Sequence, residues 1–275
     1  MNIIIKKTLI CGKILRIKSF WNETFRKFCK KKFIYTEENN FLKKLYFIFN
    51  KFLKKSNVKK SYSIGGIDLL LNYLYKNKFN GVYIDVGCNH PIDGNNTFLL
   101  YQKGWSGINV DLDSHAIKMF NYFRPKDYNA NIAVSNSEEK VDLFFYHERS
   151  TINTISKNVY NSRNKKIKGI KKIQATSLDS IIKNSPYSNK KINLLSIDVE
   201  GNELNVLKGF DLKKYYPEVI VIEYLDLVIE KLEFYNQNID TIINSEIYKY
   251  LINFNYHLVN WVHSDLVFVN NEIRN

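Results

Sequence analysis

The fold is decided by the stretch GVYIDVGCNHP, residues 81–91. The short apolar run from Val82 to Val86 predicts a buried parallel strand. It breaks at Gly87 into a polar, turn-rich segment that continues neither as strand nor as helix. A strand that leads into such a loop is typical of an α/β ligand site.

A second strand and an acidic residue follow at an informative distance. Ile108 to Val110 is apolar, and Asp111 comes directly after it, 24 positions beyond Gly87 (111 − 87). In α/β folds an acid about 20 residues beyond a glycine turn accepts hydrogen bonds from ribose hydroxyls. The spacing therefore predicts a nucleoside ligand.

The loop after Gly87 narrows the choice of nucleoside. It lacks the Gly-x-Gly-x-x-Gly pattern that brings backbone amides close to a pyrophosphate, and the chain has no Gly-x-x-x-x-Gly-Lys-Ser/Thr loop for a triphosphate. An acid before a single glycine, Asp85-Val86-Gly87, suits a ligand with a cationic, amino-acid-like end. S-adenosylmethionine is such a ligand.

A later stretch repeats this design. An apolar run from Ile192 to Ile197 ends in Asp198, and Val219 to Ile222 ends in Glu223. Ligands of open α/β sheets lie beyond the carboxyl ends of the strands. We therefore expect Asp198 and Glu223 to converge on one crevice with Asp85 and Asp111.

The other expected elements complete an alternating α/β order. Residues 147–169 form an exposed loop of unusual length, typical of a lid, and with the residues around Trp261 they are expected to build the acceptor pocket. Expected helices are Ile67 to Tyr75, Thr97 to Gln102, Ser114 to Phe123 with Ser114 as its cap, and Ile239 to Phe254. Expected strands are 129–134, an edge or hairpin strand at 141–146, and a closing antiparallel pair at 258–262 and 266–269.

Six motifs in order resemble the FkbM-type S-adenosylmethionine-dependent methyltransferases. The resemblance implies a Rossmann-like class I methyltransferase fold: a seven-stranded, mostly parallel sheet with an antiparallel last strand and helices on both faces. It also implies O-methylation of a sugar, surface glycan or related metabolite. Pro91 stands where glycine is commoner in the family, which leaves the cofactor contact intact but stiffens the loop. The motifs are DVGCN at 85–89 followed by Asp111, NIAVS at 131–135, SLD at 177–179, IDVEG at 197–201 with Glu203, LKG at 207–209 and VIE at 221–223.

The resemblance assigns cofactor contacts to five positions. Asp85 and Gly87 would face the methionine portion, Asn89 would shape the loop, Asp111 would bind the ribose and Ala133 would face the adenine. A small core residue is an alternative role for Ala133. For Asp111 the alternative is to pair with the amides at the start of the next helix, a task for which Asp113 is better placed.

Methyl transfer to a hydroxyl requires a group that removes its proton. The candidates are Asp198, Glu200 and His90, and we rank the two carboxylates first. A structural role, in holding the cofactor or capping the next helix, is as well supported for Asp198, and loop packing is favoured for His90. A divalent metal held by Asp198 and Glu223 is a further arrangement, which we disfavour because no third oxygen ligand is evident.

The first sixty residues carry the excess charge of the chain. They hold 17 Lys/Arg and 3 Asp/Glu, whereas residues 61–275 hold 24 of each (41 − 17 and 27 − 3). We therefore expect a basic amphipathic helical extension over residues 1–60 and a methyltransferase domain over 61–275. The extension either packs on the domain with a solvated lysine face, which we favour, or rests on an anionic membrane surface or on an assembly partner. With no apolar run of spanning or signal-peptide length, a cytoplasmic protein is expected, with peripheral membrane contact as the alternative.

Two other functions remain open. RNA ribose methylation would use the basic extension, but the neutral body makes a nucleic-acid partner the less favoured choice. A non-catalytic membrane-associated scaffold could also keep this fold. The acceptor, its regiochemistry and the oligomeric state have no readable sequence signal.

Overall fold

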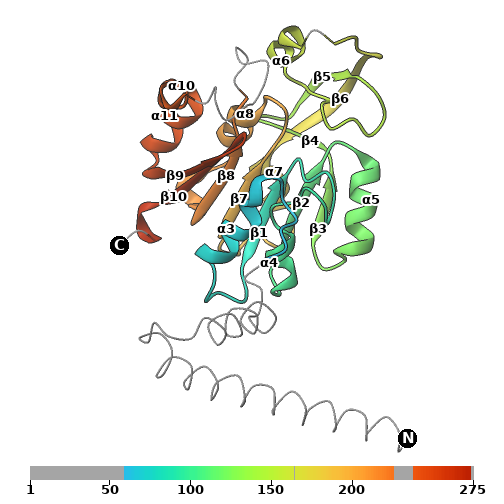
Figure 1. Ribbon diagram of the computed structural model, residues 1–275. Helices are drawn as coiled ribbons and strands as arrows, with labels where there is room; N and C mark the ends of the chain where they lie inside the picture. The colour runs from blue at the N-terminus through green and yellow to red at the C-terminus, as the bar shows by residue number, and fades with distance from the viewer. Residues whose placement is uncertain (1–58, 164, 226–237, 274–275) are drawn as a thin grey trace, which may run out of the picture. The chain divides into compact units, whose positions relative to one another are not determined.

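A computed structural model describes residues 59–163, 165–225 and 238–273. The expected basic extension lies outside the described residues, apart from its last two. The described part is a mixed α/β fold built on a seven-stranded sheet, with helices around it (Figure 1).

The sheet has the strand order β3-β2-β1-β7-β8-β10-β9. Neighbours from β3 to β8 run parallel, while β10 is antiparallel to both β8 and β9. This confirms the predicted seven-stranded sheet and its antiparallel closing strand. The strands are β1 (Val82–Val86), β2 (Ser106–Asp111), β3 (Tyr128–Asn131), β7 (Leu194–Ile197), β8 (Val219–Glu223), β9 (Tyr256–Val262) and β10 (Asp265–Asn270).

The central strands β7 and β8 are fully buried because both of their faces are covered. On β8, Ile220 and Ile222 pack into the larger core with α7, α8, α10 and α11, whereas Val219 and Val221 pack into a second core with α3 and α4. Alternate residues of a strand point to opposite faces, so a continuous apolar run is what a doubly covered strand requires. The helices of the described residues are η1 (Ile64–Gly66), α3 (Ile67–Leu74), α4 (Phe98–Gln102), α5 (Ser114–Phe123), α6 (Lys157–Ser162), α7 (Leu178–Lys183), α8 (Glu203–Lys208), α9 (Leu212–Tyr215), α10 (Ile239–Asn244), α11 (Glu246–Asn253) and η3 (Asn271–Ile273).

None of the helices in the described ranges is long and apolar enough to cross a membrane.

A second, three-stranded sheet lies beside the first (Figure 1). It has the order β4-β6-β5, with β4 (Ala133–Ser135) parallel and β5 (Glu139–Phe145) antiparallel to β6 (Gly169–Ser177). The expected strand at 141–146 is thus confirmed, and the run at 129–134 is divided between β3 and β4. The sequence analysis overlooked β6, because its exposed half, GIKKIQ, is rich in lysine and lies at the edge of a long polar segment.

Two helix predictions require correction. The single helix expected over 239–254 is two helices, because Ser245 is extended (φ −67°, ψ 151°) and its hydroxyl accepts a hydrogen bond from the Tyr248 amide. The cap of α5 is Asp113, whose carboxylate accepts from the His115 amide at 2.9 Å, and not Ser114. In both cases a side-chain cap decides where the helix begins.

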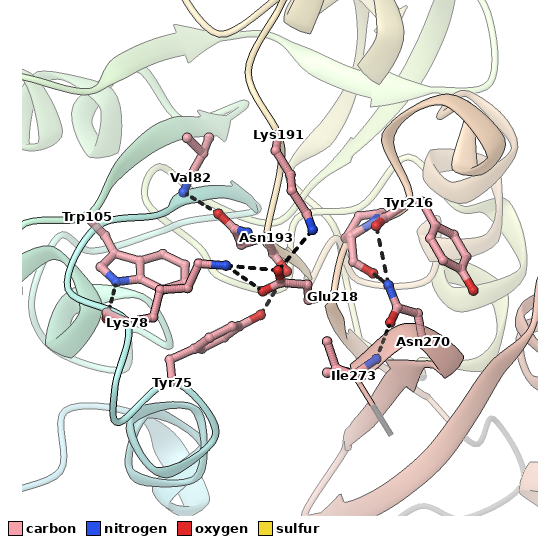
Figure 2. Close-up of polar contacts among 11 residues, drawn as sticks. Tyr75, Lys78, Val82, Trp105, Lys191, Asn193, Tyr216, Glu218, Asn270 and Ile273 are labelled. Carbon is pink, nitrogen blue, oxygen red and sulfur yellow. Dashed lines mark hydrogen bonds and ion pairs between the residues drawn. The ribbon is translucent and has the colours of Figure 1, made fainter. Parts of the chain in front are cut away.

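A polar network joins the amino-terminal ends of β1, β7 and β8 (Figure 2). These ends lie at the edge of the sheet opposite to the one where Asp111 and Asp198 follow their strands. The Asn193 side chain accepts from the Val82 amide at 3.0 Å, and the Tyr75 hydroxyl donates to the Asn193 carbonyl at 2.8 Å. Glu218, only 8% exposed, accepts from Lys78 at 2.9 Å and pairs with Lys191 at 3.2 Å. Burial alone would raise the pKa of Glu218, but the two lysines outweigh it and hold the pKa below its ordinary value.

We expect Glu218→Gln to lower the free energy of unfolding at pH 7 by about 1.5 to 3 kcal/mol, the scale of a hydrogen bond to a charged group. A depressed pKa stabilises the fold above the ordinary pKa of glutamate, and this contribution is lost as the pH falls through the folded-state value. The difference between parent and variant should therefore shrink toward pH 4. Urea unfolding at both pH values measures it, with the exposed Glu148→Gln as control. A difference that is equal at the two pH values would contradict the ion-pair explanation.

Candidate active site

A pocket opens at the carboxyl ends of β1, β2 and β7. It is lined from the sheet by Gly87, Asn89, Asp111 and Asp198, and from the segment after β5 by residues including Arg149 and Asn153. The structure therefore brings Asp111 and Asp198 to one crevice, as the strand-end rule predicts.

Gly87 lies at the closest approach between β1 and β7. Its φ is +78°, and a Cβ built on it would lie 1.6 Å from the carbonyl oxygen of Asp198. The Asp198 amide donates to the Val86 carbonyl at 2.9 Å, so the two strand ends are joined at this point. Only glycine fits both the backbone conformation and the contact.

Asp111 is held in place by the backbone of its own surroundings. Its two carboxylate oxygens accept from the Asn89 amide at 2.8 Å and from the Asp113 amide at 2.7 Å. Burial raises the pKa of Asp111 to about 6, although these two hydrogen bonds oppose the rise. Asn89 has a φ of +49°, which turns the loop so that its amide faces the carboxylate. This conformation and this hydrogen bond are consistent with the expected role of Asn89 in shaping the loop.

Asp85 points away from the pocket and into the protein. Its carboxylate accepts from the Thr97 hydroxyl at 2.8 Å and from the Asn95 side chain at 3.1 Å, and it does not line the pocket. Burial raises the pKa of Asp85, and the nearby Arg124 guanidinium opposes the rise. Contact of Asp85 with the methionine portion stays a prediction. In the structure, Asp85 stabilises the loop between β1 and α4 through its hydrogen bonds with Asn95 and Thr97.

Arg124 is the centre of that loop support, and its side chain is fully buried. It donates to the Thr97 hydroxyl at 2.8 Å, to the Asn95 side-chain oxygen at 2.7 Å and to the Pro91 carbonyl. Sequence reasoning missed Arg124, because it follows α5 in a polar stretch and nothing in its neighbours marks it as buried.

His90 serves the loop in which it lies. Its Nδ1 accepts from the amides of Ile92 at 3.2 Å and Asp93 at 2.9 Å, and the residue does not line the pocket. This geometry fits the loop-packing alternative better than the role of a base. Ala133, by contrast, lines the pocket between Ile132 and Val134, so its predicted place beside an adenine remains sterically open.

Five carboxylates gather at the ends of β7, β8 and β10. The side chains of Asp198, Glu200 and Glu223 each place one oxygen within 4.8 Å of the others. Asp265 stands opposite Glu223 in the β8–β10 pairing, and Glu203 accepts from the amides of Val199 and Gly201 at 3.1 and 2.8 Å.

The surroundings of this cluster disfavour negative charge. Asp198 is exposed to the pocket, but the protein around the pocket, and then the charges of Glu200 and Asp265, raise its pKa to about 8. Burial and then the charge of Asp198 raise the pKa of Glu223 well above its ordinary value. Burial also raises the pKa of Glu203 to about 7.

The segment after β5 closes over the turn that carries Glu200. The Thr154 hydroxyl donates to the Glu200 carbonyl at 2.7 Å, and the Arg163 guanidinium pairs with the Glu200 carboxylate. A Cβ on Gly201 would lie 2.1 Å from the Val159 side chain, which shows how closely α6 (Lys157–Ser162) packs on the turn. The expected loop at 147–169 thus contains a helix and lines the pocket, whereas Trp261 does not line it.

Basic side chains gather on this same segment. Residues 147–172 hold eight Lys/Arg and one acid, Glu148, and a hollow beside α6 is lined in part by Arg163, Lys165 and Lys166. The sequence analysis treated the body of the chain as neutral, because opposite charges elsewhere balance this local excess.

A family model described as the methyltransferase FkbM domain matches residues 85–252, more than half of the chain. No match to a curated protein was found. The matched region contains the pocket and four of the five clustered carboxylates, all but Asp265, together with most of the main sheet. With its seven-stranded sheet, its strand-end pocket and this match, the chain belongs to the FkbM methyltransferase family.

Proposed function

We propose that the protein is an S-adenosylmethionine-dependent O-methyltransferase acting on a hydroxyl of a sugar, a surface glycan or a related metabolite. The observation that carries the proposal is the Asp111 carboxylate, which lines the pocket with its oxygens fixed by two backbone amides. A carboxylate at this strand end is suited to accept hydrogen bonds from the two ribose hydroxyls.

The other residues of the pocket fit this ligand. Ala133, between Ile132 and Val134, would offer an apolar surface to the adenine, and the amino-acid end would lie beside Gly87, which lines the same pocket. When bound, S-adenosylmethionine supplies an electrophilic methyl group on a sulfonium. The chain's own part is to align the acceptor oxygen and to remove its proton.

Asp198 is the group we assign to that proton. It lines the pocket and is exposed to it, whereas Glu200 is paired with Arg163 and His90 is engaged by its own loop. Glu200 would then hold the acceptor side of the pocket in place through Arg163.

The basic segment over residues 147–172 supports an acceptor with an anionic group. Arg149 lines the pocket itself, and Arg163, Lys165 and Lys166 line the neighbouring hollow. A phosphate or carboxylate on a sugar acceptor would be attracted to this side of the opening. An acceptor screen should therefore include anionic glycans and sugar phosphates, with RNA as a separate arm.

The test is calorimetric titration of S-adenosylmethionine, and of its demethylated product, into the full chain and Asp111→Asn. We expect the substitution to weaken binding at pH 7 by about 1 to 3 kcal/mol, roughly 5- to 150-fold in Kd. Because the pKa of Asp111 is raised to about 6, a proton must leave the carboxyl before it can accept ribose hydroxyls below that pH. Parent affinity should therefore fall by up to about tenfold per unit as the pH drops below 6, and the affinity of Asp111→Asn should not.

Asp93→Asn is the matched control, because it makes the same change at an exposed position of the same loop that does not line the pocket. It should bind like the parent. Failure of the folded parent to bind either ligand would overturn the proposal, and equal affinity of parent and Asp111→Asn would remove its structural basis.

A further inference from the structure

The cluster of Asp198, Glu200 and Glu223 has the spacing of a cation site. One oxygen from each residue lies within 4.8 Å of the other two. Oxygen ligands on opposite sides of a Mg²⁺ ion are about 4.2 Å apart, and those of Ca²⁺ about 4.6 to 5.2 Å. Three carboxylate oxygens at this spacing can therefore reach one hard divalent cation.

An independent observation concerns one oxygen of Glu223. The residue is only 8% exposed, and its Oε2 atom has no hydrogen-bond partner among the residues that the structure describes. A buried polar atom without a partner costs about 1 to 3 kcal/mol, and more when it is charged. Native proteins rarely leave such an atom unpaired unless a water, an ion or a ligand completes the site.

The positively charged side chains that pair with these three carboxylates do not balance their negative charge. In the part of the chain that the structure describes, the ion pair that reaches these three residues is that of Arg163 with Glu200. Three ionised carboxylates and one guanidinium leave a charge of −2. Protons on the carboxyl groups or a bound cation must compensate this charge.

We propose that Asp198, Glu200 and Glu223 bind one divalent cation of the oxygen-preferring class, such as Mg²⁺, Mn²⁺ or Ca²⁺. With three protein oxygens, an ion of this class keeps coordination positions open. The charges of the ion, the three carboxylates and Arg163 then sum to zero.

The position of the site, beside the pocket, would allow a bound ion to contact the acceptor. Asp198 and Glu200 also line the pocket, so the cation would face the acceptor side of the space next to Asp111. It would bind an acceptor hydroxyl or a neighbouring oxygen of the sugar and orient it, while the second carboxylate oxygen of Asp198, which the cation site does not require, would accept the proton of the hydroxyl. This use rests on the proposed function, whereas cation binding itself does not.

The turn that carries Glu200 is built before any ion binds. Thr154 donates to its carbonyl, Arg163 pairs with its carboxylate, and Glu203 accepts from the amides on either side of it. The sequence analysis disfavoured a metal because it found no third oxygen ligand. The turn supplies that ligand by returning Glu200 toward the ends of β7 and β8.

The test is calorimetric titration of MnCl2 into the full chain after treatment with a chelator, without any methyl donor. We expect the parent to bind one Mn²⁺ and Glu223→Gln to bind it at least tenfold more weakly. Glu218→Gln is the matched control, since it makes the same change at an equally buried glutamate at the opposite end of β8. It should lower stability but leave Mn²⁺ affinity unchanged.

Thermal unfolding of the same three proteins checks that the variants fold. In the metal-free state Glu223→Gln should be at least as stable as the parent, because it removes one of several buried carboxyl groups whose negative charges repel one another. No Mn²⁺ binding by the folded parent, or binding that Glu223→Gln leaves unaltered, would overturn the proposal. Titration of S-adenosylmethionine in the presence of EDTA keeps this outcome separate from the proposed function, because Asp111 is not among the cation ligands.

Discussion

Replacing Gly87 with alanine is expected to cost the protein more than about 3 kcal/mol of folding free energy, or to prevent folding altogether. The added Cβ would lie 1.6 Å from the Asp198 carbonyl oxygen and 2.7 Å from its carbonyl carbon. Backbone atoms cannot yield as a flexible side chain can, so β1 and β7 would have to separate where the Asp198 amide bonds to Val86. The φ of +78° adds about 1 to 2 kcal/mol for any residue with a Cβ.

Gly94→Ala separates these two effects. Gly94 lies in the same loop with a φ of +66°, but a Cβ added there would have no atom of the described residues within 4 Å. This variant should therefore lose only the backbone cost, about 1 to 2 kcal/mol. Urea unfolding followed by circular dichroism gives both values. If the two variants proved equally stable, the close approach of β1 and β7 at Gly87 would be wrong.

Substitution of Arg124 by methionine is expected to cost about 3 to 5 kcal/mol, as for the removal of one partner from a buried charge network. The change removes the donors to Thr97, Asn95 and the Pro91 carbonyl at once. It also leaves the buried Asp85 carboxylate without the cation that opposes the rise in its pKa. The loop from β1 to α4 should lose its support, so affinity for S-adenosylmethionine should fall as well.

A double-mutant cycle shows whether Asp85 and Arg124 act as one network. Asp85→Asn removes the charge that Arg124 compensates, so the double variant should be more stable than the sum of the single effects by about 1 to 3 kcal/mol. Lys126→Met is the control, because it removes an exposed cation two residues away and should change stability by less than about 0.5 kcal/mol. Strict additivity in the cycle would show that the two residues act separately.

The two expected results concern the same physical feature, a loop held rigidly at the end of β1. Gly87 fixes where the loop begins, and Arg124 fixes its return to α4 through Asn95 and Thr97. Asn89, within that loop, then donates to Asp111 on the neighbouring strand. The pocket is thus preformed by hydrogen bonds that the ligand does not have to supply.

The sequence by itself determined the sheet and the edge at which the site lies. A short, continuously apolar run such as residues 219–222 is typical of a strand that is buried on both faces. An acid placed directly after such a run lies at the carboxyl end of the strand. These local rules were sufficient to locate Asp111 and Asp198, which line one pocket, and Glu223, which lies in the cluster with Asp198. They were also sufficient for the antiparallel closing pair β9 and β10.

Only the tertiary structure decided which polar groups meet. Arg124, Arg163 and Glu200 have ordinary sequence surroundings, and their partners lie 27 to 37 residues away in the chain. The direction of Asp85, toward Thr97 and not into the pocket, follows from those partners. Hydrogen bonds and charge pairs depend on positions in space, which periodicity does not encode, whereas burial of an apolar face does leave a period in the sequence.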